Sequence, residues 1–140
     1  MTKLPFGFKA CLLLTDIGFL TYWGVSALVL VGLLNIPGDW LFNDYYNPIV
    51  FAWNWSFMPL DVILSLLGIA SLRLLARGNT QWKSLLLISM SLTFCAGLMA
   101  ISFWAIRLEF DVSWWAANLF LMIWPVIYLP QIIRIQHEAL

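Results

Sequence analysis

Residues 53–61 read WNWSFMPLD, and they lie inside an apolar run that is long enough to cross a lipid bilayer. Within this run, Pro59 interrupts helical hydrogen bonding, and Asp61 brings a carboxyl group into the hydrocarbon. A charged side chain at the centre of a membrane helix costs about 2.5–3.5 kcal/mol on insertion scales. The folded protein must offset this cost, so the surroundings of Asp61 are central to any account of the chain.

The composition is typical of an integral membrane protein. Of the 140 residues, 63% are hydrophobic and 10% are charged, whereas soluble domains have about 45–50% apolar and about 25% charged residues. The formal net charge is zero, so no basic surface indicates a nucleic-acid partner. We expect a single transmembrane domain over residues 1–140, with the lipid bilayer as its main partner.

Four apolar runs predict an all-α fold, an integral membrane four-helix bundle. Each run has about the 20 residues that a helix needs to span hydrocarbon. The predicted helices cover roughly residues 10–34, 48–72, 84–106 and 112–133. Between the first two, residues 35–47 form a longer loop that either lies flat at the membrane interface or folds over the bundle, and both arrangements stay open.

The basic residues predict the orientation of the bundle. Loops on the cytoplasmic side of a membrane carry an excess of Lys and Arg. Six of the seven basic residues fall at the two termini or in the second loop, and Arg107 falls on the opposite side. We therefore expect both termini to be cytoplasmic, the N-in/C-in arrangement.

The second predicted helix has one polar face. Asn54, Asp61, Ser65 and Gly68 recur at helical spacing, so they share a face that we expect to point inward. At about 1.5 Å per residue, Asp61 lies near the membrane midplane. Without a basic residue in the same layer, its carboxyl is expected to be a neutral acid. A kink at Pro59 would open a pocket beside it.

The first and fourth predicted helices place further candidates at comparable depths. Asp16 lies roughly 10 Å from the cytoplasmic boundary, which offsets it from Asp61 by more than one helical turn and argues against direct contact. Tyr22 and Trp23 fall level with Asp61, and Tyr128 falls near the level of Asp16. These positions predict a polar interior shared by several helices.

The third predicted helix carries small residues along one side. These residues are Ser84, Ser91, Cys95 and Ser102. Because small residues let membrane helices approach closely, we expect this side to pack against a neighbouring helix.

Two interpretations of the polar residues stay open. In the first they bind a ligand or protons, and the candidates are Asp61, Asp16, Asn54, Ser65, Tyr22, Trp23 and Tyr128. In the second, Asp16 and Asp61 are structural hydrogen-bonding anchors, which is also the interpretation favoured for Asn54 and Asn118. No metal site or cofactor is predicted, since two separated cysteines and His137 cannot form a zinc site.

The sequence contains none of the common catalytic motifs that would indicate an enzyme. The sequence has no phosphate loop, no HExxH motif and no dinucleotide fingerprint. We expect a non-enzymatic membrane protein that binds an apolar or cationic small molecule, or a partner, in its polar interior. The alternative is a proton-coupled small-molecule transporter acting as a homo-oligomer, and a third, less favoured, is an enzyme with Asp61 as acid or base.

Three segments in the first half of the chain resemble the YvaD-like family. They read TDIGFLTYW at residues 15–23, NDYYNP at 43–48 and AWNWSFMPLD at 52–61. The members of this family are small four-helix bacterial membrane proteins of unknown function. The resemblance implies the four-helix fold and a place in the bacterial inner membrane, and it supplies no activity.

Overall fold

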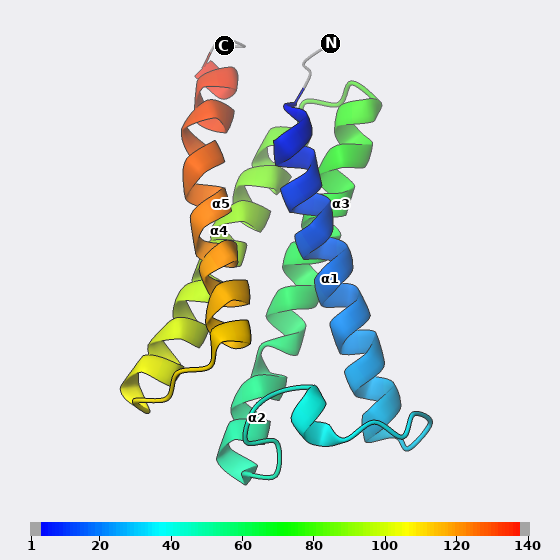
Figure 1. Cartoon of the computed structure of the whole chain (residues 1–140). Coiled ribbons are helices and arrows are strands. Elements are labelled where there is room, and N and C mark those ends of the chain that lie inside the picture. Colours follow the sequence, from blue (N-terminus) through cyan, green and yellow to red (C-terminus); the bar gives the residue numbers. More distant parts are fainter. Residues whose placement is uncertain (1–3, 138–140) are drawn as a thin grey trace.

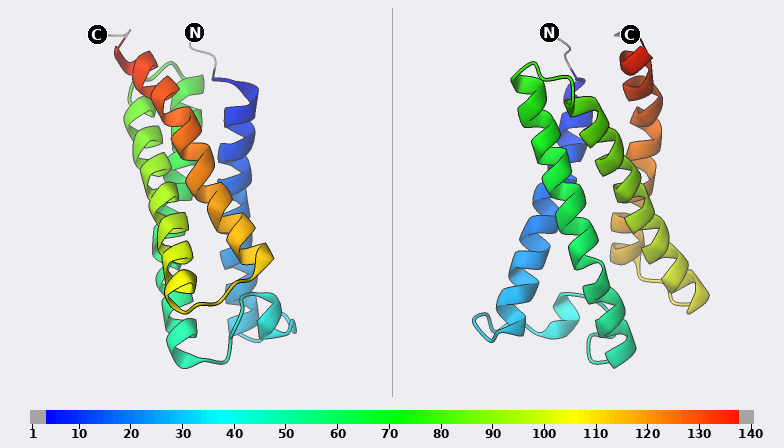
Figure 2. Two further views of the ribbon diagram at one scale, coloured as in Figure 1. Left: turned by 60° about the vertical axis from the view of Figure 1, so that its left-hand side comes forward. Right: turned by 180° about the vertical axis from the view of Figure 1, so that it is seen from behind.

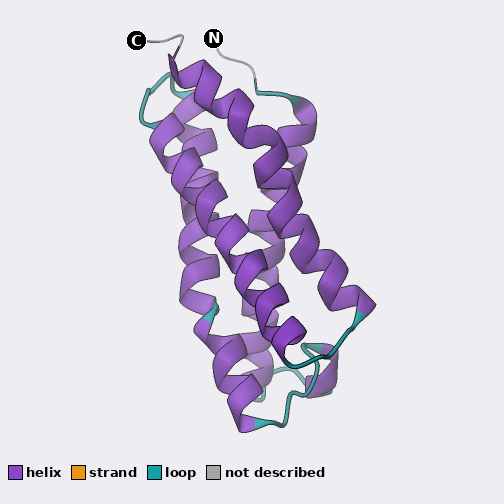
Figure 3. Cartoon of the chain, turned by 90° about the vertical axis from the view of Figure 1, so that its left-hand side faces the viewer, coloured by secondary structure: helices purple, strands orange, loops and turns teal. Residues whose placement is uncertain are grey.

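A computed structural model describes residues 4–137, and this part of the chain consists of helices and loops without a strand (Figures 1 and 3). The elements in order are α1 (Phe6–Leu30), the short 3-10 helix η1 (Gly38–Trp40), α2 (Pro48–Ser56), α3 (Met58–Ala76), α4 (Trp82–Ile106) and α5 (Val112–His137). The all-α prediction is confirmed. Lys3, which entered the charge count, lies outside the described residues.

Within residues 4–137, four helical segments are long and apolar enough to cross a membrane. Three of them are α1, α4 and most of α5, and the fourth is the combined span Pro48–Ala76, formed by α2 and α3. The two ends of the chain lie at the same end of the bundle (Figure 1). We call this the terminal end, and we call the opposite end, with the loops at residues 31–47 and 107–111, the loop end.

The first helix covers Phe6–Leu30 instead of the predicted 10–34. Gly32 stops it with a left-handed φ of 75°. The amide of Leu33 then donates to the carbonyl of Leu28 at 2.9 Å, a hydrogen bond typical of glycine-terminated helices. The prediction placed the end at the later Pro-Gly cluster and overlooked this glycine.

The second span is divided into two helices, whereas a single helix over roughly 48–72 with a kink at Pro59 was predicted. The helix breaks at Phe57, because Pro59 has no N–H to continue the hydrogen-bond ladder. Helical bonding resumes where the amide of Asp61 donates to the carbonyl of Phe57 at 2.9 Å. The expected kink therefore lies one turn on the loop-end side of Asp61.

The polar face of this span points inward as predicted. Asn54, Asp61 and Ser65 are 6%, 3% and 0% exposed, and Gly68 is also buried. Helix α1 packs along α3, α3 along α4, and α4 along α5 (Figure 2). The inward face therefore lies between α1 and α4.

The predicted contact side of α4 is wrong. Ser84, Ser91, Cys95 and Ser102 are exposed. The buried small residues are instead Ser89, Thr93, Ala96, Gly97 and Ala100. A Cβ at Gly97 would lie 2.6 Å from the carbonyl oxygen of Asn118, so α5 approaches α4 closely at this glycine.

The loop at residues 35–47 folds over the loop end of the bundle. Phe42 is 2% exposed and belongs to an apolar cluster with Val50 and Trp104. Its ring centroid lies 4.8 Å from that of Tyr45. Of the two arrangements that the sequence left open, the structure therefore has the one in which the loop caps the bundle.

Candidate functional site

A cavity of about 450 Å³ lies in the half of the bundle nearer the loop end. All four spans contribute to its wall. The lining residues are Leu14, Thr15, Gly18, Phe19, Tyr22, Trp23, Trp40, Leu41, Trp53, Asn54, Phe57, Asp61, Ala96, Ala100, Ser113, Trp114, Ala117, Asn118, Phe120 and Leu121.

Asp61 supplies the acidic group in the wall of this cavity. Its side chain is buried, and the indole Nε1 of Trp23 donates to Asp61 Oδ2 at 2.9 Å. Within the described part of the chain, Asp61 Oδ1 has no hydrogen-bond partner. The predicted level of Trp23 and Asp61 is confirmed, and one buried carboxyl oxygen has no partner in the described part of the chain.

Asn54 and Tyr22 form a second polar contact in the same wall. Asn54 Nδ2 donates to Tyr22 Oη at 3.2 Å, and the Tyr22 ring centroid lies 4.9 Å from that of Trp23. The structure thus brings together four of the predicted candidates, namely Asp61, Asn54, Tyr22 and Trp23, around one cavity. The arrangement combines hydrogen-bonding groups with aromatic faces.

Asp16 lies apart from this cavity. It is fully buried against α3, where a Cβ at Gly68 would lie only 2.1 Å from Asp16 Oδ2. Gly68 is about two helical turns from Asp61 along α3, which agrees with the predicted offset between the two carboxyls. Neither oxygen of Asp16 has a hydrogen-bond partner among residues 4–137. Ser65, also fully buried, lies between these two levels of α3.

Tyr128 is not at the predicted level. A Cβ at Gly7 would lie 2.8 Å from Tyr128 Oη, so this hydroxyl lies far from the cavity, near the terminal end. Trp124 occupies the level of Asp16 instead, and its Nε1 donates to Thr15 Oγ1 at 3.1 Å. The rings of Trp124 and Tyr128 both pack against Phe8 near the start of α1, so this part of α5 lies closer to the terminal end than counting residues from the helix ends indicated.

Sequence reasoning missed part of the cavity wall. Thr15 and Ser113 add hydroxyl groups, and Trp40 and Leu41 close the wall from the folded loop. The loop residues gave no signal, because their position depends on tertiary packing. Asn118 also lines the cavity, and its Nδ2 donates to the carbonyl of Trp114 at 2.8 Å, in agreement with the structural hydrogen bonding expected for it.

The cavity opens on the side of the bundle between α1 and α5. On α1, the lining residue Leu14 is 67% exposed and Gly18 is also exposed, and on α5 the lining residue Ala117 is exposed. In a membrane-spanning bundle these residues face lipid.

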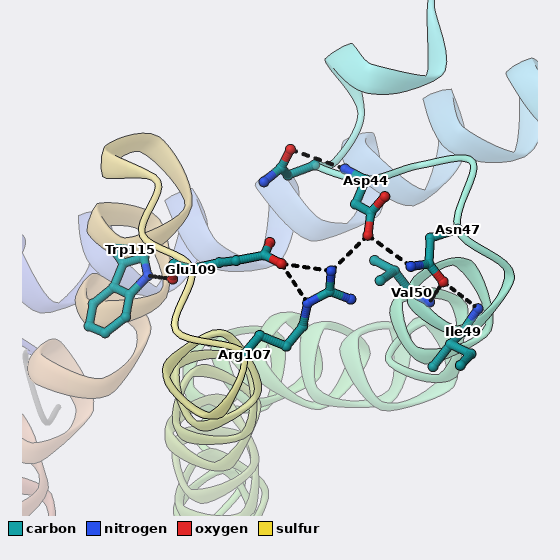
Figure 4. Close-up of polar contacts among 8 residues, drawn as sticks. Asp44, Asn47, Ile49, Val50, Arg107, Glu109 and Trp115 are labelled. Carbon is teal, nitrogen blue, oxygen red and sulfur yellow. Dashed lines mark hydrogen bonds and ion pairs between the residues drawn. The ribbon is translucent and has the colours of Figure 1, made fainter.

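Arg107 connects two loops at the loop end (Figure 4). Its Nη2 donates to Asp44 Oδ2 at 2.8 Å and to Glu109 Oε1 at 2.7 Å. The hydrogen bond to Glu109, with that to Asp44, raises the pKa of the Arg107 guanidinium above its usual value. This ion-paired group joins the 35–47 loop to the connection between α4 and α5.

The backbone around this group is strained. Asp44 and Leu108 have φ values of 57° and 58°, in the left-handed region. For a residue with a side chain this conformation costs roughly 1–2 kcal/mol. The contacts of Arg107 and a hydrogen bond from Asn47 Nδ2 to Asp44 Oδ2, at 3.0 Å, help to hold the strained turn at Asp44.

Asp111 starts α5 at the same end. Its Oδ1 accepts hydrogen bonds from the hydroxyl of Ser113 and from the amide of Trp114, the latter at 2.9 Å. The bond from Ser113 is the main reason that the pKa of Asp111 is lowered from its ordinary value. This helix cap fixes the first turn of α5, which includes the cavity residues Ser113 and Trp114.

Replacing Arg107 with alanine is expected to loosen the 35–47 loop more than it destabilises the whole protein. Partly exposed ion pairs contribute only about 0.2–1 kcal/mol each, so the free energy of unfolding should change little. Chymotrypsin should cut faster at Tyr46, which is 76% exposed. The matched control is Arg77→Ala at the terminal end. Equal cleavage rates in the two variants would contradict the proposed role of Arg107 in holding the loop.

Comparison with known proteins supports the resemblance seen in three sequence segments. The model of a family described as "Family of unknown function (DUF5360)" matches residues 8–139. The chain is 42% identical to "Uncharacterized protein YvaD" of Bacillus subtilis (strain 168) over 126 residues, which cover 90% of this chain and 91% of that protein. No solved structure matches the chain. The similarity extends well beyond the first half, and the chain belongs to the DUF5360 family, with YvaD as a relative.

Proposed function

We propose that this chain binds an apolar or cationic small molecule in the cavity beside Asp61, as a multi-pass protein of the bacterial inner membrane. The observation that carries the proposal is a buried carboxyl with one unpaired oxygen at the wall of a 450 Å³ cavity. Cavities of about 300–1,000 Å³ that combine apolar walls with a few polar groups are typical of small-molecule sites.

The opening between α1 and α5 supports access from the membrane. Exposed lining residues such as Leu14 would contact lipid, and Trp40 and Leu41 of the folded loop add to the wall at the loop end. A ligand that partitions into the bilayer would reach the cavity sideways. The molecule would place its apolar part at this opening and its polar part at Asp61.

The test uses a photoreactive diazirine alcohol with a short alkyl chain, added to the protein in lipid nanodiscs. Labelling should map to peptides that line the cavity. Gly18→Leu should reduce it, because Gly18 lies in the wall near the opening with free space around its Cβ position. Gly24→Leu is the matched control, since Gly24 has equal space outside the lining. Equal labelling of both variants, or labelling spread over all lipid-facing peptides, would contradict the proposal.

The orientation is part of the same proposal, with both termini in the cytoplasm. Six of the seven basic residues support it, because they fall at the termini or in the second loop. A reporter that is active only in the cytoplasm should work when fused after residue 140 and should fail when inserted in the 35–47 loop. The reverse result would contradict the orientation, and equal activity at both positions would contradict the four-span topology.

A second candidate function is proton-coupled transport by a homo-oligomer. The observation that favours it is Asp16, a second fully buried carboxyl without a hydrogen-bond partner in the described part of the chain. Two such groups about two turns apart are the kind of arrangement that proton pathways use. In proteoliposomes, a transporter would move protons when a substrate gradient is imposed, and Asp16→Asn would stop this. Ligand binding without proton movement would favour the binding function alone.

A further inference from the structure

The described lining of the cavity contains the carboxyl of Asp61, the side-chain amides of Asn54 and Asn118, and several hydroxyl groups. It includes no Lys, Arg or His. An anionic ligand would therefore meet Asp61 without any basic side chain to balance the charge. An ammonium group, in contrast, would be balanced by the Asp61 carboxyl, whose buried Oδ1 has no partner among residues 4–137. The electrostatics of the wall select for positive charge.

The rings of Trp23, Trp53 and Phe57 line the same cavity as this carboxyl. The Trp23 indole is fixed by its hydrogen bond to Asp61 Oδ2, and Trp53 is stacked on Phe103 with centroids 3.8 Å apart. The Phe57 ring lies against Trp53 at 4.9 Å. A cation beside Asp61 would lie near these rings, and cation–π contacts are stronger where water is excluded.

The depth and size of the cavity argue for a free amine over a lipid headgroup. Asp61 lies near the middle of the Pro48–Ala76 span, about 20 Å from either end. A phospholipid headgroup there would bring its phosphate into a wall without a described basic residue. The volume of 450 Å³ suits a molecule of drug size and not a whole lipid.

Building on the function proposed above, we infer that the ligand is a lipophilic amine. It enters from the bilayer between α1 and α5 as the neutral base. In the cavity it takes the proton of the Asp61 carboxylic acid, so that an ammonium and a carboxylate form together. Its apolar part then lies along Gly18, Phe19 and Ala117 of the wall.

The test compares a photoreactive long-chain diazirine amine with its N-acetyl amide, which has the same skeleton and no charge. In nanodiscs, cavity peptides should be labelled by the amine at about tenfold or lower concentration than by the amide, as expected for an ion pair flanked by rings. Asp61→Asn should abolish this preference. Asp39→Asn, at an exposed site in η1, should retain it.

Each remaining outcome has a distinct meaning. Equal labelling of the wild-type cavity by both probes would overturn the amine inference and leave small-molecule binding intact. Cavity labelling by neither probe would overturn both. Displacement of the amine by phosphatidylethanolamine, but not by phosphatidylglycerol, would assign the ammonium to a lipid headgroup and overturn the free amine as ligand.

Discussion

Gly68→Ala is expected to destabilise the folded bundle by about 1–3 kcal/mol through overpacking, although alanine is the better helix former. The new Cβ would lie 2.1 Å from Asp16 Oδ2 and 2.9 Å from its Cγ. Because Asp16 is fully buried, the residues packed around it would have to accommodate any shift of its carboxyl. The measurement is the free energy of unfolding of the purified protein in detergent micelles.

Two glycines of α1, Gly18 and Gly24, provide the control for the effect of Gly68→Ala in α3. A Cβ at Gly18 or Gly24 meets nothing within 4 Å, so alanine at either position should not destabilise the bundle and should add about 0.5–1 kcal/mol through its better helix propensity. Combining Gly68→Ala with Asp16→Ala removes both members of the clash. The double variant should therefore lose less stability than the sum of the single variants, whereas additive losses would contradict the contact between the two residues.

Asp61→Leu is expected to destabilise the protein by about 1–3 kcal/mol, because it leaves a buried donor without an acceptor. That donor is the indole N–H of Trp23, a residue that is 5% exposed. Asp61→Asn keeps an acceptor oxygen at the same place, so its stability should stay close to that of the wild type. Thermal unfolding in the same detergent compares the three proteins.

The two variants should agree in binding although they differ in stability. Both remove the carboxyl that the amine would pair with, so both should reduce labelling by the amine to the level of the amide. Asn and Leu at position 61 thereby separate the structural role of the residue from its binding role. Equal destabilisation by both substitutions would contradict the hydrogen bond from Trp23 as the source of the stability.

The architecture was largely predictable because lipid imposes simple rules on sequence. A span needs about 20 apolar residues, and this rule alone gave four spans. The inward face with Asn54, Asp61 and Ser65 followed from helical spacing, since burying a polar group in the bundle interior is better than exposing it to hydrocarbon. That Trp23 lies level with Asp61 followed from counting depth along two adjacent helices, whereas the hydrogen bond between the two side chains was not predicted.

The wrong predictions concern how the helices pack against one another, namely which side of α4 is buried and how α5 is placed along α1. A side of α4 with apolar and small residues can face either lipid or a neighbouring helix, because both environments are apolar. Composition therefore could not distinguish the buried side with Ser89 and Gly97 from the exposed side with Ser91 and Cys95. The level of Tyr128 depends on how α5 is placed along α1, where the Tyr128 and Trp124 rings contact Phe8. Neither quantity is encoded in residue spacing.

The polar groups of the candidate site could be predicted from the sequence, but the extent of the cavity could not. The polar groups of the cavity were visible as rare polar residues in apolar runs. Its boundaries were not, because Trp40 and Leu41 reach the wall only through the folded 35–47 loop. The inward position of Phe42, which is 2% exposed, depends on partners distant in sequence, such as Trp104.

The most direct test of ligand binding at Asp61 is infrared difference spectroscopy of its carboxyl group in nanodiscs. The carboxylic C=O band of Asp61 is isolated as the difference between the wild type and Asp61→Asn. We expect this band in the protein without added probe at pH 7. The long-chain diazirine amine should replace it with carboxylate bands, while the N-acetyl amide should leave the acid in place. A C=O band that is unchanged at saturating amine would contradict a ligand site at Asp61.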